Sequence, residues 1–297
     1  MVARLGRRQW LQAAGLAGVG LLLGGAWVAD GVRRERALWQ RLSQQRPSHP
    51  LLGQWVWTPE DLALLRVARR ARPELVAGVY VGSLGRQGDG VRWKRGLAPA
   101  RAAGGPVAVV VRAEDELHDL WSQLGSRAMT AALAAALGPL LAELDAAGLP
   151  LVQLQLDYDC PVRWLAEYAA ALTSLRQGCL AGRALWLTSL PAHLSEPRYA
   201  ARLEGVVEGH VLQLFDTGLP ASEQAALRLR TLLERQPLPF CYGLGAFERV
   251  TPAGPTEHRH WWRLGASHLD SLPHFRGRWL FPAGQAYDRL LDDPSTG

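Results

Sequence analysis

Polar and apolar residues alternate with period two along residues 151–159. Gln153, Gln155, Asp157 and Asp159 fall on one face of this segment, and the other face carries Val and Leu. Alternation of this kind predicts a β-strand. The strand ends in the two carboxylates, and Pro161 then opens a predicted helix over residues 162–177, where a proline in the first turn is well tolerated.

A polar stripe on a strand with an apolar back is typical of an inner barrel strand that helices cover. Asp157 and Asp159 would then lie at the carboxyl end of the strand, where barrel enzymes keep their chemistry. The alternative is an edge strand that ends in a solvated Asp-x-Asp turn.

The same reasoning predicts seven further strands, at residues 54–57, 76–81, 106–112, 184–190, 210–216, 239–245 and 278–282. Helices are expected from Thr58 onward and over residues 133–147, 199–206 and 222–236, with a Gly/Arg-rich loop or irregular excursion over residues 85–105. Eight strands with helices between most of them predict an α/β fold, a (β/α)8 TIM-like barrel that is irregular around strands 2–3 and 7–8. An open doubly wound sheet is the alternative, but it would want a glycine-rich phosphate loop, which is absent from the sequence.

Composition fits one sizeable domain. The chain has 297 residues, 48% of them hydrophobic, and we expect the barrel over residues 53–290 after a tether over residues 31–52. The net charge of +6 is spread along the chain without a nucleic-acid-binding motif, so we expect a solvated surface and no nucleic-acid partner. We also expect a monomer. Twelve Trp against five Phe is unusual, and Trp suits sugar rings as well as cores.

The first thirty residues have the layout of an export signal. Arg4, Arg7 and Arg8 precede an uncharged run over residues 10–29, and the paired arginines resemble the twin-arginine pattern. The run is about long enough to span a bilayer, so residues 1–30 predict either a cleaved signal peptide or an uncleaved anchor. In both cases we expect the rest of the chain to be periplasmic or extracellular.

Several of these motifs in tandem resemble the bacterial domain-of-unknown-function family 3142, over roughly residues 53–285. The resemblance implies a barrel like those of glycoside hydrolases. The last strand, residues 279–283, departs from the family's pattern of an Arg before a Leu-Pro pair. The motifs that carry the resemblance are Gln155-Leu-Asp-Tyr-Asp159, Tyr168, Leu172, Leu187-Thr-Ser-Leu-Pro191, Gln213-Leu-Phe-Asp216 and the strand that begins at Pro239.

Candidate catalytic residues are carboxylates, because glycosidases generally use one as an acid and a second as a base or nucleophile. Asp157 and Asp159 end the fourth strand and Glu248 follows the seventh, a pairing that resembles many retaining glycosidases. Two adjacent aspartates favour one staying protonated near neutral pH, as an acid catalyst requires. The structural alternative is that an aspartate caps the next helix.

Hydrogen-bonding groups late in the other strands are candidates for binding a polyhydroxylated ligand, although buried polar groups satisfied within the core are commoner. They are Tyr80, Gln155, Thr188, Gln213, Asp216 and Tyr242. We expect neither metal nor cofactor, because the histidines are sparse and the three cysteines show no zinc spacing.

Two functions follow from these observations. The first is an exported glycoside hydrolase of the cell envelope that acts on a polysaccharide or oligosaccharide. The second is a non-catalytic envelope protein whose degenerate barrel binds a glycan or a protein partner. Fold analogy does not decide between them.

Overall fold

The computed structural model describes residues 50–96, 103–148, 151–251, 254–257, 260–285 and 287. The predicted export segment, residues 1–30, and most of the predicted tether, residues 31–52, lie outside these residues. Residues 45–297 form one compact unit, which contains every described residue.

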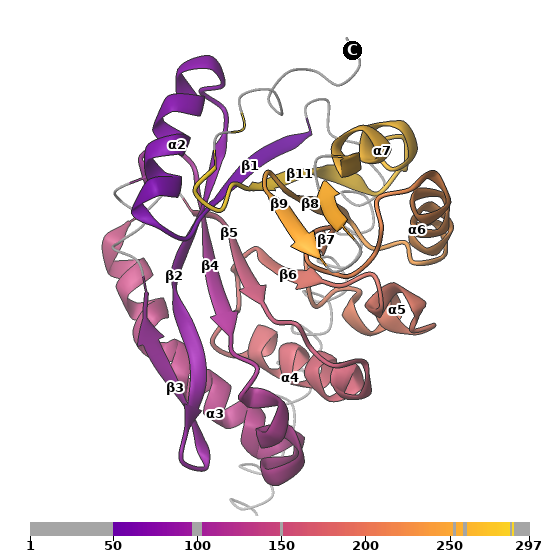
Figure 1. The fold of residues 1–297 in the computed structure, drawn as a ribbon. Helices are drawn as coiled ribbons and strands as arrows, with labels where there is room; N and C mark the ends of the chain where they lie inside the picture. Colours follow the sequence, from indigo (N-terminus) through magenta and orange to yellow (C-terminus); the bar gives the residue numbers. More distant parts are fainter. Residues whose placement is uncertain are drawn as a thin grey trace, which may run out of the picture. The chain divides into compact units, whose positions relative to one another are not determined.

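Eight parallel strands close into a barrel (Figure 1). Strand β1 pairs in parallel with both β11 and β2, so the first strand joins the last one and closes the sheet. This closure confirms the predicted (β/α)8 fold and excludes the open doubly wound sheet. The barrel strands are β1 (Leu51–Val56), β2 (Val76–Gln87), β4 (Val107–Ala113), β5 (Leu151–Asp157), β6 (Leu185–Ser189), β7 (Gly209–Gln213), β8 (Phe240–Gly245) and β11 (Phe275–Phe281).

Helices lie around the strands in Figure 1. Two of them, α2 and α6, begin at side-chain caps. At α2, Thr58 Oγ1 accepts a hydrogen bond from the Asp61 N–H, and the Asp61 carboxylate accepts one from the Thr58 N–H. Ser222 caps α6 in the same position. The helices are α2 (Pro59–Ala71), α3 (Leu117–Ala147), α4 (Leu165–Gln177), α5 (Tyr199–Leu203), α6 (Glu223–Arg235) and α7 (His260–His268), with short 3-10 turns at Val162–Trp164 and His193–Ser195.

Two hairpins interrupt the regular alternation at the places where irregularity was predicted. After strand two, β2 runs on to Gln87 and turns at Gly88 (φ 57°) into the antiparallel strand β3 (Gly90–Arg95). Of the two alternatives expected for residues 85–105, the first part is an irregular excursion and not a loop, because the glycine turn lets the strand fold back on itself as a hairpin. A second hairpin, β9 (Glu248–Thr251) and β10 (Gly254–Glu257), follows β8.

Helix α3 is longer than the predicted helix over residues 133–147. Its run is broken at Gly125, whose backbone is not helical (φ 70°, ψ 165°). Among the described residues it is the one helix long and apolar enough to cross a membrane by length and composition. We interpret it as a helix of the barrel's outer layer, since Met129, Leu137 and Leu140 are buried in the same core as the strands.

Aromatic side chains fill the barrel interior, and glycines face them from neighbouring strands. Trp55 and Trp279 stack inside the barrel with ring centroids 5.6 Å apart. A Cβ on Gly53 would come within 2.5 Å of the Trp279 ring, and one on Gly243 within 2.6 Å of Trp55. The strands next to each tryptophan therefore carry no side chain at these points.

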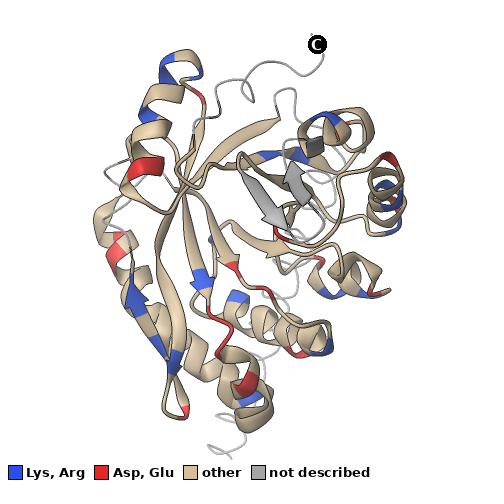
Figure 2. Cartoon of the chain, viewed as in Figure 1, with Lys and Arg blue, Asp and Glu red and all other residues tan. Residues whose placement is uncertain are grey.

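Charged residues are sparse on the barrel strands. Figure 2 shows Lys and Arg spread over the outer helices and β3, while most barrel strands other than β11 are nearly uncharged up to their ends. Basic and acidic segments then appear where β4 and β5 end. Charge therefore enters the barrel mainly at the carboxyl ends of these strands.

Candidate functional site

A pocket of about 310 Å³ opens at the carboxyl ends of the barrel strands. Its apolar wall consists of Trp55, Trp57, Val110, Phe215 and Phe281. Trp55 lies on β1 and Trp57 directly after it, Val110 lies on β4, Phe215 follows β7, and Phe281 ends β11. Its polar wall consists of Arg112, Asp157, Asp159, Thr188, Gln213 and Asp216. Aromatic faces beside carboxylates are what a sugar ring with its hydroxyl groups requires.

Asp157 and Asp159 lie together in this pocket, both half-buried. Burial and the neighbouring Asp159 raise the pKa of Asp157 from its ordinary 3.8 to about 6, against a hydrogen bond with Thr188 and the charge of Arg112, which lower it. Burial also raises the pKa of Asp159, while Arg112 opposes that rise. Burial, ahead of the neighbouring charge, is therefore the main reason that the pKa of Asp157 is raised toward the neutral range.

Arg112 supplies positive charge to the pocket wall. Its Nε lies 3.4 Å from Glu114 Oε2, and its guanidinium lies 5.8 Å from the ring centroid of Trp57. Trp57 in turn stacks on Tyr80, with the ring centroids 4.4 Å apart and the planes nearly parallel. Tyr80 thus stands behind Trp57 and is not among the residues that line the pocket.

Gln155 contacts the pocket indirectly, through Trp55. It is fully buried, and its Oε1 accepts a hydrogen bond of 2.8 Å from Trp55 Nε1. Trp55 is a lining residue, so Gln155 acts on the pocket through the position of that ring. Gln155 itself is not among the lining residues.

The end of β7 contributes a second polar edge. Gln213 Nε2 donates a hydrogen bond of 3.3 Å to the carbonyl of Phe215. Asp216 adopts a left-handed backbone conformation (φ 54°) that is uncommon outside glycine, and its side chain is exposed at the pocket. Backbone strain of this kind is often kept where a side chain has a role.

Tyr242 lies outside the pocket, unlike the expectation from its place in the strand. Its hydroxyl donates to Asp270 Oδ1 at 2.8 Å and accepts from Arg278 Nε at 2.7 Å, and its ring lies against Gly265 of α7. Neighbouring residues of a strand point to opposite faces, and Tyr242 points to the helices. It is therefore a structural residue, and we withdraw it as a ligand-binding candidate.

Glu248 is the first residue of β9, and its side chain lies outside the described residues. The proposed pairing of a carboxylate on strand four with one after strand seven stays a prediction.

No group of three His, Cys, Asp or Glu side chains that could hold a metal ion occurs among the described residues. Cys160, Cys179 and Cys241 are free thiols, and the first and last of them are buried.

Arg112 is a site residue that the sequence reasoning missed. The signal was present, because Arg112 ends an otherwise uncharged strand of Val and Ala. A charge at that place is costly unless the strand end opens to water or to a partner. Phe215 and Phe281 were missed because an aromatic residue late in a strand is usually part of the core.

Comparison with known proteins adds a family match over part of the chain. Residues 103–248 match the family model described as Domain of unknown function (DUF3142). The resemblance drawn from the sequence motifs is confirmed over this segment, which begins before β4 and ends at the start of β9. The DUF3142 match leaves out β1, β2 and β11, which complete the barrel. No curated protein matches the chain.

Solved structures similar to this chain include two chitinases and a spore cortex-lytic enzyme. The chitinase from Chromobacterium violaceum ATCC 12472 is 14% identical with a TM-score of 0.59, covering 84% of this chain and 100% of its own. The spore cortex-lytic enzyme SleL of Bacillus cereus is 13% identical with a TM-score of 0.57, covering 83% and 74%. A GH18 chitinase from Pseudoalteromonas aurantia is 12% identical with a TM-score of 0.54, covering 78% and 94%. At these identities the likeness shows a glycoside-hydrolase-like barrel fold.

Proposed function

We propose that this chain binds a polysaccharide or oligosaccharide in the pocket at the carboxyl end of the barrel and hydrolyses it by general acid catalysis. The observation that carries the proposal is the Asp157–Asp159 pair, set at the end of β5 beside aromatic walls and able to hold a proton near neutral pH. The barrel fold shared with two chitinases and a spore cortex-lytic enzyme supports a glycan as the first ligand class to test.

In this proposal Asp157 is the acid. Its carboxyl proton passes to the glycosidic oxygen as the bond from that oxygen to the anomeric carbon breaks. Asp159, ionised beside it, stabilises the positive charge that develops on the sugar ring. Water then supplies the hydroxyl group to the anomeric carbon, and its remaining proton restores the carboxyl group of Asp157. Trp57 and Phe281 offer apolar surface to the sugar.

The test is a screen of the purified full-length protein against chitin oligosaccharides, peptidoglycan and exopolysaccharides, with release of reducing ends as the measurement. Because the acid must be protonated, hydrolysis is expected to be faster at pH 5 than at pH 8, with the decline centred near pH 6. Glycan binding without any released reducing end would support the non-catalytic alternative. Absence of both binding and hydrolysis across the panel would overturn the proposal.

We also propose that the barrel works outside the cytoplasmic membrane, on the evidence of the amino-terminal sequence pattern. Replacing Arg7 and Arg8 together by lysine is expected to retain the protein in the cytoplasm, because twin-arginine signals depend on the arginine pair. Immunoblotting of cell fractions measures the result. Unchanged export of the double variant would contradict the twin-arginine route and leave general secretion or a plain anchor.

A further inference from the structure

Thr188 has a different place in the site from that of a simple ligand-binding group. It lies on β6, one residue beyond the pair Leu156–Leu187 that aligns β5 with β6, and so stands beside Asp157. It lines the pocket, yet the residue is only 6% exposed. A hydroxyl buried this far needs partners within the protein.

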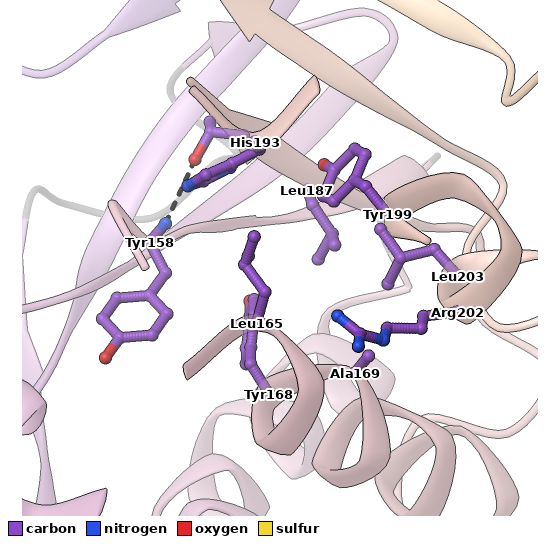
Figure 3. Close-up of a pocket in the computed structure, with 10 residues that line it drawn as sticks. Tyr158, Leu165, Tyr168, Ala169, Leu187, His193, Tyr199, Arg202 and Leu203 are labelled. Atoms are coloured by element: carbon purple, nitrogen blue, oxygen red, sulfur yellow. Dashed lines mark hydrogen bonds between the residues drawn. The ribbon is translucent and has the colours of Figure 1, made fainter. Parts of the chain in front are cut away.

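The oxygen of that hydroxyl already has a partner in the backbone. Thr188 Oγ1 accepts a hydrogen bond of 3.1 Å from the Tyr158 N–H, drawn as a dashed line in Figure 3. With the oxygen held from that side, the single hydroxyl proton is left for a second partner, and the Asp157 carboxylate is the acceptor that the pairing of β5 with β6 places beside it in the same pocket. The Thr188 hydroxyl therefore lies between the backbone that joins the two aspartates and the strand position of Asp157.

The segment that carries the aspartates is fixed at several further points. The hydroxyl of Tyr158 accepts a hydrogen bond of 3.0 Å from Trp121 Nε1, and the Tyr158 ring meets Tyr168 edge-on at 5.1 Å. His193 Nε2 lies 2.8 Å from the carbonyl oxygen of Cys160. Figure 3 shows the side chains of His193, Leu165 and Tyr168 gathered near Tyr158. The backbone from Tyr158 to Cys160 therefore has little freedom to move away from Thr188.

We propose that Thr188 is the positioning residue of this site: its hydroxyl, oriented by the Tyr158 N–H, donates to the Asp157 carboxylate and thereby governs when Asp157 holds a proton. The inference deepens the proposed hydrolysis, because the proton on Asp157 is the one the reaction uses. Donation to the carboxylate favours its ionised form and offsets burial. The other charged groups that act on Asp157 are Asp159, Arg112 and Glu114, and the Thr188 substitution leaves all three in place.

The experiment is an NMR titration of the Asp157 carboxyl group in the full chain, which needs no substrate. Thr188→Val keeps the shape of the side chain and removes the hydroxyl, so the pKa of Asp157 is expected to rise by about one unit. Thr188→Ser restores the hydroxyl and is expected to titrate like the wild type. Thr188→Cys, with its weak S–H donor, is expected to lie between them and serves if the valine variant does not fold.

Trp121→Phe is the matched control. It removes the hydrogen bond at the far end of Tyr158 without touching Asp157, so it is expected to lower the melting temperature and leave the Asp157 titration unchanged. If Thr188 merely stiffened the backbone, both variants would lower the melting temperature and neither would move the titration. That result, or equal titrations in the valine and serine variants, would overturn the inference.

The pH profile and KM of the Thr188→Val variant distinguish this inference from the proposed function. In the valine variant the decline of hydrolysis at high pH is expected to move upward by the same amount as the titration, with KM little changed. A large rise in KM without a shifted pH profile would assign Thr188 to ligand binding and contradict the inference. A shifted titration in a protein that cleaves no glycan would support the coupling of Thr188 to Asp157 and overturn the hydrolytic function instead.

Discussion

Replacing Asp157 by asparagine is expected to lower the rate of glycan hydrolysis by at least about 100-fold while the melting temperature at pH 7 stays at or above that of the wild type. The loss follows from the role of an acid catalyst, which contributes roughly 100- to 10,000-fold to a rate. Asparagine has nearly the same shape as aspartate but carries no transferable proton. Reducing-end release and thermal unfolding, measured on the same preparation, give both quantities.

The expected stability follows from the sign of the pKa shift. The pKa of Asp157 is raised in the folded protein from its ordinary 3.8 to about 6, so the folded state binds this proton more tightly than the unfolded chain. The unfolding free energy therefore falls as the pH rises from about 4 to about 6. Above that interval the ionised carboxylate of Asp157 keeps the unfolding free energy lowered by a constant amount. The asparagine variant carries no such cost at pH 7.

Asp89→Asn is the control for this substitution, because Asp89 is exposed between β2 and β3, away from the pocket. It is expected to change neither hydrolysis nor melting temperature. If Asp157→Asn lowered the melting temperature clearly while glycan binding persisted, Asp157 would be a structural acceptor, and its catalytic role would be excluded.

Replacing Trp279 by alanine is expected to cost about 3–5 kcal/mol of unfolding free energy. Trp279 is fully buried and stacks on Trp55 inside the barrel. The glycines that face it, among them Gly53 and Gly78, have no side chains with which to fill the space that alanine would leave. For a domain of this size the loss corresponds to a fall of about 10 °C in melting temperature.

Urea unfolding of the Trp279→Ala variant measures the loss directly. Trp164→Ala, which truncates a half-buried tryptophan at the start of α4, is the matched control and is expected to cost clearly less. Glycan binding is expected to weaken in the Trp279 variant only, because Trp55 would lose the ring behind it and Trp55 lines the pocket. A cost below about 1 kcal/mol would mean that the barrel interior repacks without Trp279.

The barrel could be predicted from the sequence because its eight strands each have a local pattern. The alternation along β5 located Asp157 and Asp159 at a strand end, and they line the pocket. A strand buried on both faces gives no such alternation. Every residue of β8 is buried, so the sequence could not tell that Tyr242 points outward and Gly243 inward.

Contacts between distant segments were out of reach of the sequence. Gly243 faces the barrel interior, where the ring of Trp55 fills the space beside it. Trp55 lies nearly 190 positions earlier in the chain, so the sequence around Gly243 gives no sign of this contact. In the same way, nothing local in Leu187-Thr-Ser distinguishes a threonine that meets a ligand from one that holds Asp157. The distinction depends on the Tyr158 N–H, which reaches Thr188 only through the pairing of β5 with β6.

The seam at which the barrel closes has a consequence for the order of folding during synthesis. Strand β1 is the first barrel strand to leave the ribosome, and its partner β11 is the last, so Leu51 and Gly277 meet only when nearly the whole domain has been made. Until then Trp55 lacks the ring of Trp279, and one edge of β1 is unpaired. Pairings between such distant strands form slowly and leave apolar edges exposed meanwhile. The nascent chain is therefore most prone to aggregate just before its final strand is added, and a chain cut short before β11 would carry this exposed edge permanently.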